Sequence, residues 1–243
     1  SGQADGGLFL YTWDGTTDYG FVTNPRLRDI AAWYHVVYSV DTTQGTAADR
    51  IKIYVNNQLV SGSVHTDYGT IPLNHQMHVN NTQAQYIGRY QTNSQYFDGY
   101  LAEVHFIDGG ARPPSDFAEA HEDTGQWIPK EYTGGSYGTN GFYLKFASGA
   151  LGTDSAGSNN YTAVNLADAD VMPDTPTNSF PTINNVGGIG GNNTYSQGNL
   201  RFTNDSTSNY DTGACSAFGT MAIDTSDSTG WYWELLMEDL GRE

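Results

Sequence analysis

Apolar and polar residues alternate along several short segments of this chain, most clearly between residues 100 and 107. One face of an extended chain here would carry Tyr100, Ala102, Val104 and Phe106. An Asp-Gly turn precedes the segment at residues 98–99, and a second turn follows at residues 108–110. The pattern predicts a sheet strand that is packed on at least one face.

The same alternation predicts other strands, at residues 8–13, 33–41, 50–55, 58–60, 141–146 and 199–203. Asn56 and Asn57 tolerate the positive φ of a two-residue turn, so the strands on either side of them should form a hairpin. Weaker strand patterns occur at residues 77–79 and 85–88. Ser115 is placed to cap a short helical turn that runs through Glu122.

The periodic pattern fades after Phe146 and resumes near Asn199. We therefore expect a β-sandwich in residues 1–146, which lacks its first strands. An extended linker rich in Gly, Asn and Thr should follow in residues 147–198. Residues 199–243 then begin a second β-domain, which is truncated. Because the chain starts at Ser1 and not at Met, its true start is expected to be missing.

The composition supports a folded protein with many short strands joined by turns. Charged residues make up only 15% of the chain, aromatic residues reach 13%, and there are 29 glycines. The formal net charge of −17 argues against nucleic acid and anionic membranes as partners, since both attract basic surfaces. No apolar run approaches the roughly 20 residues of a membrane span, and no signal peptide opens the chain.

Three quoted segments carry a family resemblance. YFDGYLAEVHFIDG (from Tyr96), WYHVVYSVDTT (from Trp33) and DRIKIYVNNQLV (from Asp49) resemble the laminin-G/pentraxin branch of the concanavalin-A-like sandwiches. The resemblance implies an all-β fold, an antiparallel jelly-roll β-sandwich. The segment TGQWIPKEYTGGSYGTNGFYLKF (from Thr124) is similar to the form found in bacteriophage tail-fibre and virion proteins. Residues 230–235 resemble the opening strand of a SPRY domain.

Catalytic residues are not apparent in the sequence. Glycoside hydrolysis needs two converging carboxylates, but the odd spacing of Glu103 and Asp108 places them on opposite faces of a strand. His75 and His78 would also point to opposite faces if their segment is extended, which argues against a shared metal ion. Cys215 is the one cysteine and has no His or Cys nearby in the sequence. We expect a protein that is not an enzyme.

Two groups of aromatic and polar loop residues are candidates for saccharide binding, because sugars bind to aromatic faces and to Asn and Asp side chains. The first group contains Tyr11, Trp13, Asp14, Asp18 and Tyr19. The second contains Tyr90, Asn93, Tyr96 and Asp98. Ca²⁺ held by loop carboxylates is one alternative use of these residues. Another is that the tyrosines are core or interface residues.

The phage resemblance implies a virion protein, a tail fibre or appendage that attaches to a glycan on the host surface. Such a protein is assembled in the bacterial cytoplasm and is extracellular once released. Its expected partners are other virion proteins and the host glycan, without nucleic acid or membrane insertion, and fibres are commonly homotrimers. A purely structural role, as head decoration or tail scaffold, is the alternative, followed by a capsule-depolymerising hydrolase. An animal laminin-G module is disfavoured by the single cysteine.

Overall fold

The computed structural model describes residues 6–29, 32–92, 94–122, 125–178, 181–189, 193–204, 216–220 and 232–238. The chain divides into two compact units, Ser1–Ser179 and Phe180–Glu243. Each unit is built from antiparallel strand pairs, and no α-helix occurs in the described ranges. The predicted all-β class is therefore confirmed. None of the helical turns in these ranges has the length and apolarity needed to cross a membrane.

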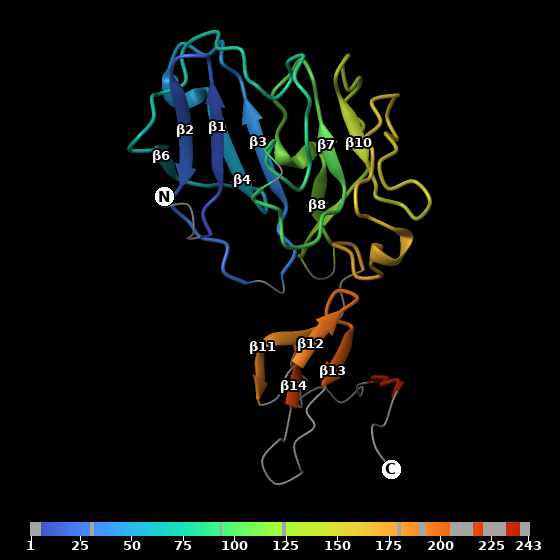
Figure 1. Cartoon of the computed structure of the whole chain (residues 1–243). Coiled ribbons are helices and arrows are strands. Elements are labelled where there is room, and N and C mark those ends of the chain that lie inside the picture. Colours follow the sequence, from blue (N-terminus) through green and yellow to red (C-terminus); the bar gives the residue numbers. More distant parts are fainter. Residues whose placement is uncertain are drawn as a thin grey trace. The chain divides into compact units, whose positions relative to one another are not determined.

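Among the described residues of unit 1, ten short strands form four sheets, and Figure 1 labels most of these strands. The first sheet has the order β1-β2-β6 and consists of β1 (Phe9–Trp13), β2 (Asp18–Thr23) and β6 (Gly62–Val64). The second has the order β3-β4-β5 and consists of β3 (Val36–Val40), β4 (Ile51–Val55) and β5 (Gln58–Leu59). Two strand pairs follow, made of β7 (Val104–Phe106) with β10 (Phe142–Leu144) and β8 (Ala118–Ala120) with β9 (Trp127–Pro129). Single 3₁₀ turns lie at η1 (Ala47–Asp49), η2 (Pro114–Asp116) and η3 (Asp168–Asp170).

Unit 2 contains two further strand pairs. β11 (Ile183–Ile189) pairs with β14 (Ser216–Gly219), and its register shifts between Asn184 and Ile189. β12 (Asn193–Ser196) pairs in continuous register with β13 (Arg201–Asn204), and the ring centroids of Tyr195 and Phe202 lie 5.7 Å apart.

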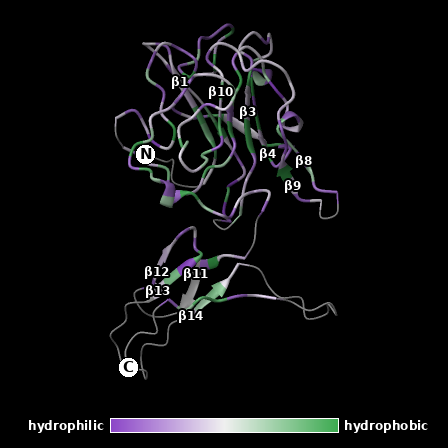
Figure 2. Cartoon of the chain, turned by 90° about the vertical axis from the view of Figure 1, so that its right-hand side faces the viewer, coloured by the Kyte–Doolittle hydropathy of each residue, from purple (hydrophilic) through white to green (hydrophobic). Residues whose placement is uncertain are grey.

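The buried core of unit 1 is small and consists mainly of strand residues. Ile53 in β4 and Leu144 in β10 are each only 1% exposed, and Thr12 in β1 is equally buried. Figure 2 shows hydrophobic stretches along strands such as β3, surrounded by hydrophilic loops. Ile53 points into the core while its neighbours in β4 are only partly buried, because alternate residues of a strand face opposite sides of the sheet.

Several predicted elements are confirmed with shorter bounds. The strands expected at residues 8–13, 33–41, 50–55, 58–60, 141–146 and 199–203 correspond to β1, β3, β4, β5, β10 and β13. The hairpin between β4 and β5 turns at Asn56 and Asn57, whose φ values are +46° and +68°. Asparagine tolerates such positive φ values, which explains its presence at both positions.

Other expectations were wrong. Residues 77–79 and 85–88 form turns and bends but no strand. Ser115 lies inside the 3₁₀ turn η2, which has no side-chain cap and is followed at once by strand β8. The long strand expected from Tyr100 begins only at Val104, because Glu103 has a φ of +52° and interrupts the extended backbone. Tyr100 and Leu101 are therefore in a loop, 50% and 41% exposed.

The boundary between the two units lies inside the stretch 147–198 for which we predicted an extended linker. Residues that follow β10 return to it, since Leu144 forms a bridge with Asp154 and the Tyr161 N–H donates to Gly152 O. At the other end, β11 and β12 belong to unit 2. The expected domain limits stay a prediction. Residues 232–235, placed in a SPRY-like strand, are exposed without strand structure, and residues 230–231 lie outside the described residues.

Two buried charged side chains hold the loops of unit 1. The Asp154 carboxylate is 4% exposed and accepts backbone N–H groups from Tyr143, Ala156 and Asn159 at 2.9–3.0 Å. The Arg50 guanidinium is 9% exposed and donates to the carbonyl oxygens of Gln44, Gly45 and Ile71 at 2.8–3.0 Å. Each side chain therefore provides hydrogen-bond partners for loop backbone groups that have no partner in a neighbouring strand.

Candidate functional site

The first candidate group lies on the β1–β2 hairpin, where strand alternation separates its side chains. Thr12 pairs with Tyr19, and both point to the buried side of the sheet. Tyr11 and Trp13 lie on the other side, 40% and 42% exposed. One strand therefore presents aromatic rings to solvent while its intervening residue is anchored in the core.

Further rings pack against Tyr11, and we call the surface that they form together with Trp13, on the same side of β1, the aromatic face. It consists of Phe9, Tyr11, Trp13, His65 and Tyr68. The Phe9 ring centroid lies 6.3 Å from that of Tyr11 and 5.7 Å from that of Tyr68, and Tyr68 lies 4.7 Å from His65. The distance between Tyr11 and Tyr68 is 5.6 Å. These spacings are typical of aromatic rings that pack edge to face or offset.

A glycine makes room for this arrangement. Gly20 pairs with Tyr11 in the β1–β2 register. A Cβ atom at this position would lie 2.6 Å from Tyr68 Cδ2 and 3.0 Å from Phe9 Cε2. The rings of Tyr68 and Phe9 therefore rest directly on the backbone at Gly20, as expected for a strand glycine at a close approach.

The carboxylates of the first group are engaged by neighbouring side chains. Asp14 Oδ1 accepts N–H groups from Thr16 and Thr17 at 2.9 and 2.8 Å, and its Oδ2 accepts the Tyr19 hydroxyl at 2.6 Å. The hydrogen bond from Tyr19, together with those from the turn, lowers the pKa of Asp14 well below its usual range. Asp14 therefore fixes the hairpin turn, and its role in binding a ligand stays a prediction.

Asp18 serves the aromatic face more directly, because its carboxylate accepts the Tyr11 hydroxyl at 2.5 Å. This hydrogen bond, with smaller effects of burial and of nearby charges, raises the pKa of Tyr11 to about 12. Tyr11 thus stays protonated and keeps a fixed ring orientation. A polar edge lies beside the exposed ring, where sugar hydroxyl groups can bond.

The second candidate group is only partly described. Tyr90 and Tyr96 are 43% and 66% exposed, and Asp98 is exposed in the same loop. Asn93 lies outside the described residues. No contact links Tyr96 or Asp98 to the aromatic face within the described chain.

Sequence reasoning missed Phe9, His65 and Tyr68 as members of the aromatic face. Phe9 reads as an ordinary strand residue, although its alternation with Tyr11 and Trp13 was a usable signal. The two others lie in the loop after β6. Their approach depends on a pairing between β2 and β6 that spans about 40 residues of sequence, which no local pattern reveals.

The two histidines considered for a metal ion have separate partners. His75 Nε2 lies 3.3 Å from Thr12 Oγ1, and its ring lies 5.0 Å from Tyr19 on the buried side of the sheet. The His78 ring instead meets Trp13 edge to face at 6.0 Å. Within the described ranges, no group of three or more His, Cys, Asp or Glu side chains is placed to hold a metal ion. Ca²⁺ binding stays a prediction.

The carboxylates considered for hydrolysis lie in different environments. Asp108 accepts the Asn80 side-chain amide at 2.7 Å and the Asn140 backbone N–H at 3.1 Å. Glu103 accepts the Tyr143 hydroxyl, and its Oε2 lies 3.8 Å from His105 Nε2. The interaction with His105, aided by Tyr143 and opposed by burial, lowers the pKa of Glu103. A general acid would need the opposite shift.

His105 lies within a second, more enclosed group of rings. Its ring is stacked on Tyr143 at 4.1 Å and on Tyr137 at 6.0 Å, and its Nδ1 lies 2.8 Å from the Tyr137 hydroxyl. A groove of about 430 Å³ adjoins Tyr137, lined by the polar loops 135–141 and 156–159. Asn159 joins these loops by donating to Thr139 O and Gly141 O. The histidine is therefore a packing residue beneath polar loops.

With this geometry established, the comparison with protein families is informative. Residues 2–116 match the family model of the concanavalin A-like lectin/glucanases superfamily. The matched part of unit 1 includes β1 to β7 and the whole aromatic face, and the antiparallel all-β architecture is consistent with a sandwich of this superfamily. No curated protein and no solved structure matches the chain. The segment 124–146, from which we expected a relation to virion proteins, lies beyond the matched residues.

Proposed function

We propose that this chain is a non-enzymatic saccharide-binding protein and that its aromatic face is the binding surface. The observation that carries the proposal is the exposure of Tyr11 and Trp13 on one side of β1, next to the Tyr11–Asp18 hydrogen bond. Aromatic rings contact the C–H surfaces of sugars, while fixed polar groups bond their hydroxyls. The superfamily matched by residues 2–116 includes lectins by its description.

The biological setting that we propose is a bacteriophage virion, where the protein attaches to a glycan on the bacterial surface. This part rests on the resemblance of residues 124–146 to tail-fibre and virion proteins. The acidic net charge of −17 supports a saccharide partner over nucleic acid. Homo-oligomerisation, as in trimeric fibres, belongs to the same proposal.

A structural role in the virion is the second candidate, and one surface favours it. Tyr96, Phe97, Tyr100 and Leu101 are 41–66% exposed along a single loop. Exposed apolar residues in this number often mark contacts with other proteins. A hydrolase is less well supported, because every resolved carboxyl pKa shift among the described residues is downward, whereas the acid catalyst needs a raised pKa.

Replacement of Trp13 or Tyr11 by alanine should weaken binding to a saccharide about tenfold, the equivalent of ~1.4 kcal/mol. The assay is a bacterial-glycan array followed by titration of the best glycan, with and without EDTA. Tyr232→Ala is the control, since Tyr232 is 83% exposed in unit 2. Glycan binding that survives both face variants would overturn the choice of site. A folded protein that binds no glycan would favour the structural role.

A further inference from the structure

Arg89 stands out among the cationic side chains of the described residues. Its guanidinium carbon lies 4.1 Å from the centroid of the Tyr86 ring, a cation–π contact that holds the guanidinium plane in place. Its Nη1 atom is buried and has no hydrogen-bond partner. A buried N–H group without a partner costs about 1–3 kcal/mol. The free protein therefore holds an arginine that is oriented but not satisfied.

The absence of a partner is unexpected in so acidic a chain, which has 27 Asp and Glu residues against 10 Lys and Arg. Two other arginines are well paired. Arg50 donates to three carbonyl oxygens, and Arg201 lies 2.7 Å from the Glu238 carboxylate. Within the part of the chain that the structure describes, no carboxylate lies within ion-pair distance of Arg89. An acidic group from outside the chain can supply the missing acceptor.

The position of Arg89 connects it to the aromatic face. Its neighbour Tyr90 is 43% exposed in the same loop. The preceding part of this loop is tied to the face, because Gln85 Nε2 donates to His78 O at 3.1 Å. The His78 ring in turn contacts Trp13. The loop that carries Arg89 is therefore tied to the Trp13 end of the face.

We propose that the saccharide bound at the aromatic face is acidic and that Arg89 pairs with its carboxylate. A planar guanidinium binds a planar carboxylate through two parallel hydrogen bonds, which a neutral sugar does not offer. Nη1 is covered in the free protein, so the carboxylate reaches it only when a covering group moves. The net charge of −17 repels an acidic saccharide, although salt screens this repulsion beyond about 8 Å, so the attraction to Arg89 has to exceed it. This inference rests on the proposed function and narrows its ligand class.

The test uses alginate, hyaluronan and polygalacturonate oligosaccharides, each compared with its own carboxyl-reduced, neutral form. Calorimetric titration of the full chain should show at least one acidic oligosaccharide that binds about tenfold more tightly than its neutral form. Arg89→Gln should remove this difference while leaving the affinity for the neutral form unchanged. Arg89→Lys should retain only part of it, because an ammonium group lacks the planar fork. Sulfated dextran and inorganic phosphate test whether any anion suffices.

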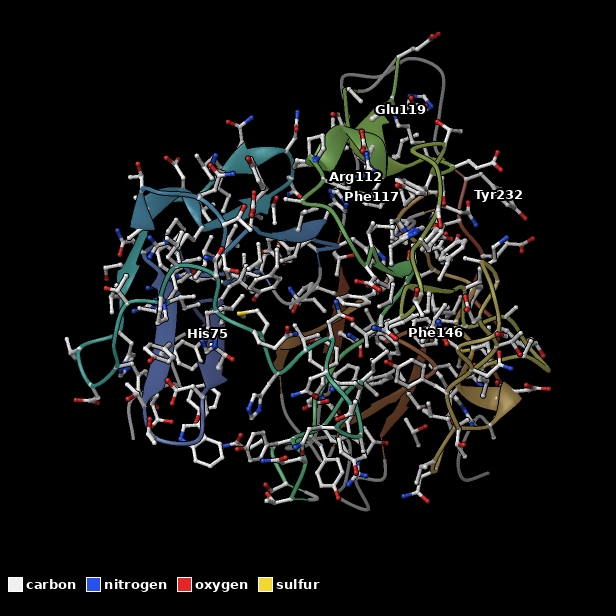
Figure 3. All side chains as sticks on the ribbon, turned by 90° about the horizontal axis from the view of Figure 1, so that it is seen from above. His75, Arg112, Phe117, Glu119, Phe146 and Tyr232 are labelled. Carbon is white, nitrogen blue, oxygen red and sulfur yellow. The ribbon has the colours of Figure 1, made fainter. Side chains whose placement is uncertain are left out.

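The matched control is Arg112→Gln, which changes the net charge equally. Arg112 also has a buried nitrogen without a partner, its Nε, but it lies with Phe117, away from His75 and the first strands (Figure 3). If Arg112→Gln reduces the preference for the acidic form as much as Arg89→Gln does, only the net charge matters, and the inference is contradicted. Equal affinity for acidic and neutral forms, lost in Trp13→Ala, would overturn the inference but keep the proposed function. If sulfated dextran or inorganic phosphate binds more tightly than the carboxylated oligosaccharides, the recognised group is a sulfate or phosphate and not a carboxylate. If the protein binds none of these saccharides, both proposals are refuted.

Discussion

Replacement of Asp154 by alanine is expected to destabilise unit 1 by about 3 kcal/mol and to lower its melting temperature by roughly 10 °C. The carboxylate accepts backbone N–H groups of Tyr143, Ala156 and Asn159 and is 4% exposed. Without it, each donor loses its acceptor at a position where water enters poorly. Thermal and urea unfolding, followed by circular dichroism, measure the loss.

The control for this variant is Asp168→Ala, which removes an exposed carboxylate that accepts only the Gly149 N–H. It should change the free energy of unfolding by less than about 1 kcal/mol. If the two variants are equally stable, the Asp154 carboxylate does not hold the loop together. Asp154→Asn should lie between wild type and alanine, because an amide oxygen accepts hydrogen bonds without the charge.

The Asp154 carboxylate also makes a prediction about pH. Burial raises its pKa, but the hydrogen bonds from Tyr143, Ala156 and Asn159 outweigh burial and leave the pKa lowered. A lowered pKa in the folded state means that the carboxylate stabilises the fold at pH above its unfolded pKa of about 4. This stabilisation is lost as the pH falls through the lower, folded value. The stability difference between wild type and Asp154→Ala, measured by urea unfolding from pH 7 to pH 2, should therefore shrink below about pH 4.

Replacement of Arg50 by methionine is expected to cost about 3 kcal/mol as well. Arg50 precedes β4, and its guanidinium holds the carbonyl oxygens of Gln44, Gly45 and Ile71. Methionine retains the apolar bulk but leaves three acceptors without their donors. The free energy of unfolding of this variant, determined from urea titrations, gives the size of the effect.

Lys52→Met is the comparison for Arg50, because it removes the same charge from the same region. Lys52 is 42% exposed in its side chain and lies 3.6 Å from Asp49 across a surface ion pair. Such a pair contributes about 0–1 kcal/mol, so this variant should unfold almost like wild type. A large loss in both variants would indicate a general charge effect and not the hydrogen bonds of Arg50.

Local patterns were enough to predict the strands whose stabilising contacts are also local. The β4–β5 hairpin followed from alternation on both sides of Asn56 and Asn57, and β1 followed from its apolar residues before an Asp-Gly turn. The residues of the first candidate group lie together on one hairpin because they are also close together in the sequence. Both exposed rings, Tyr11 and Trp13, stand on the side that strand alternation implies.

The remaining features depend on backbone conformation and on distant partners. Glu103 has nothing in its neighbourhood that signals a left-handed conformation, so a regular pattern around it predicted a strand that is mostly loop. Asp14 looked like a ligand for sugar or Ca²⁺, yet its hydrogen bonds belong to its own turn and to Tyr19. The role of Asp154 depends on Tyr143, eleven positions earlier, whose N–H is left over at the edge of a short strand.

Gly20 has a consequence for how this surface can change over time. The rings of Tyr68 and Phe9 rest on its bare backbone, 2.6 and 3.0 Å from where a Cβ would stand. A single codon change to alanine or serine would lift both rings and alter the contour of the aromatic face, while the strand pairing beneath it stays intact. For a protein that recognises a variable surface, one position of this kind offers a mutational route to a new preference without refolding the scaffold.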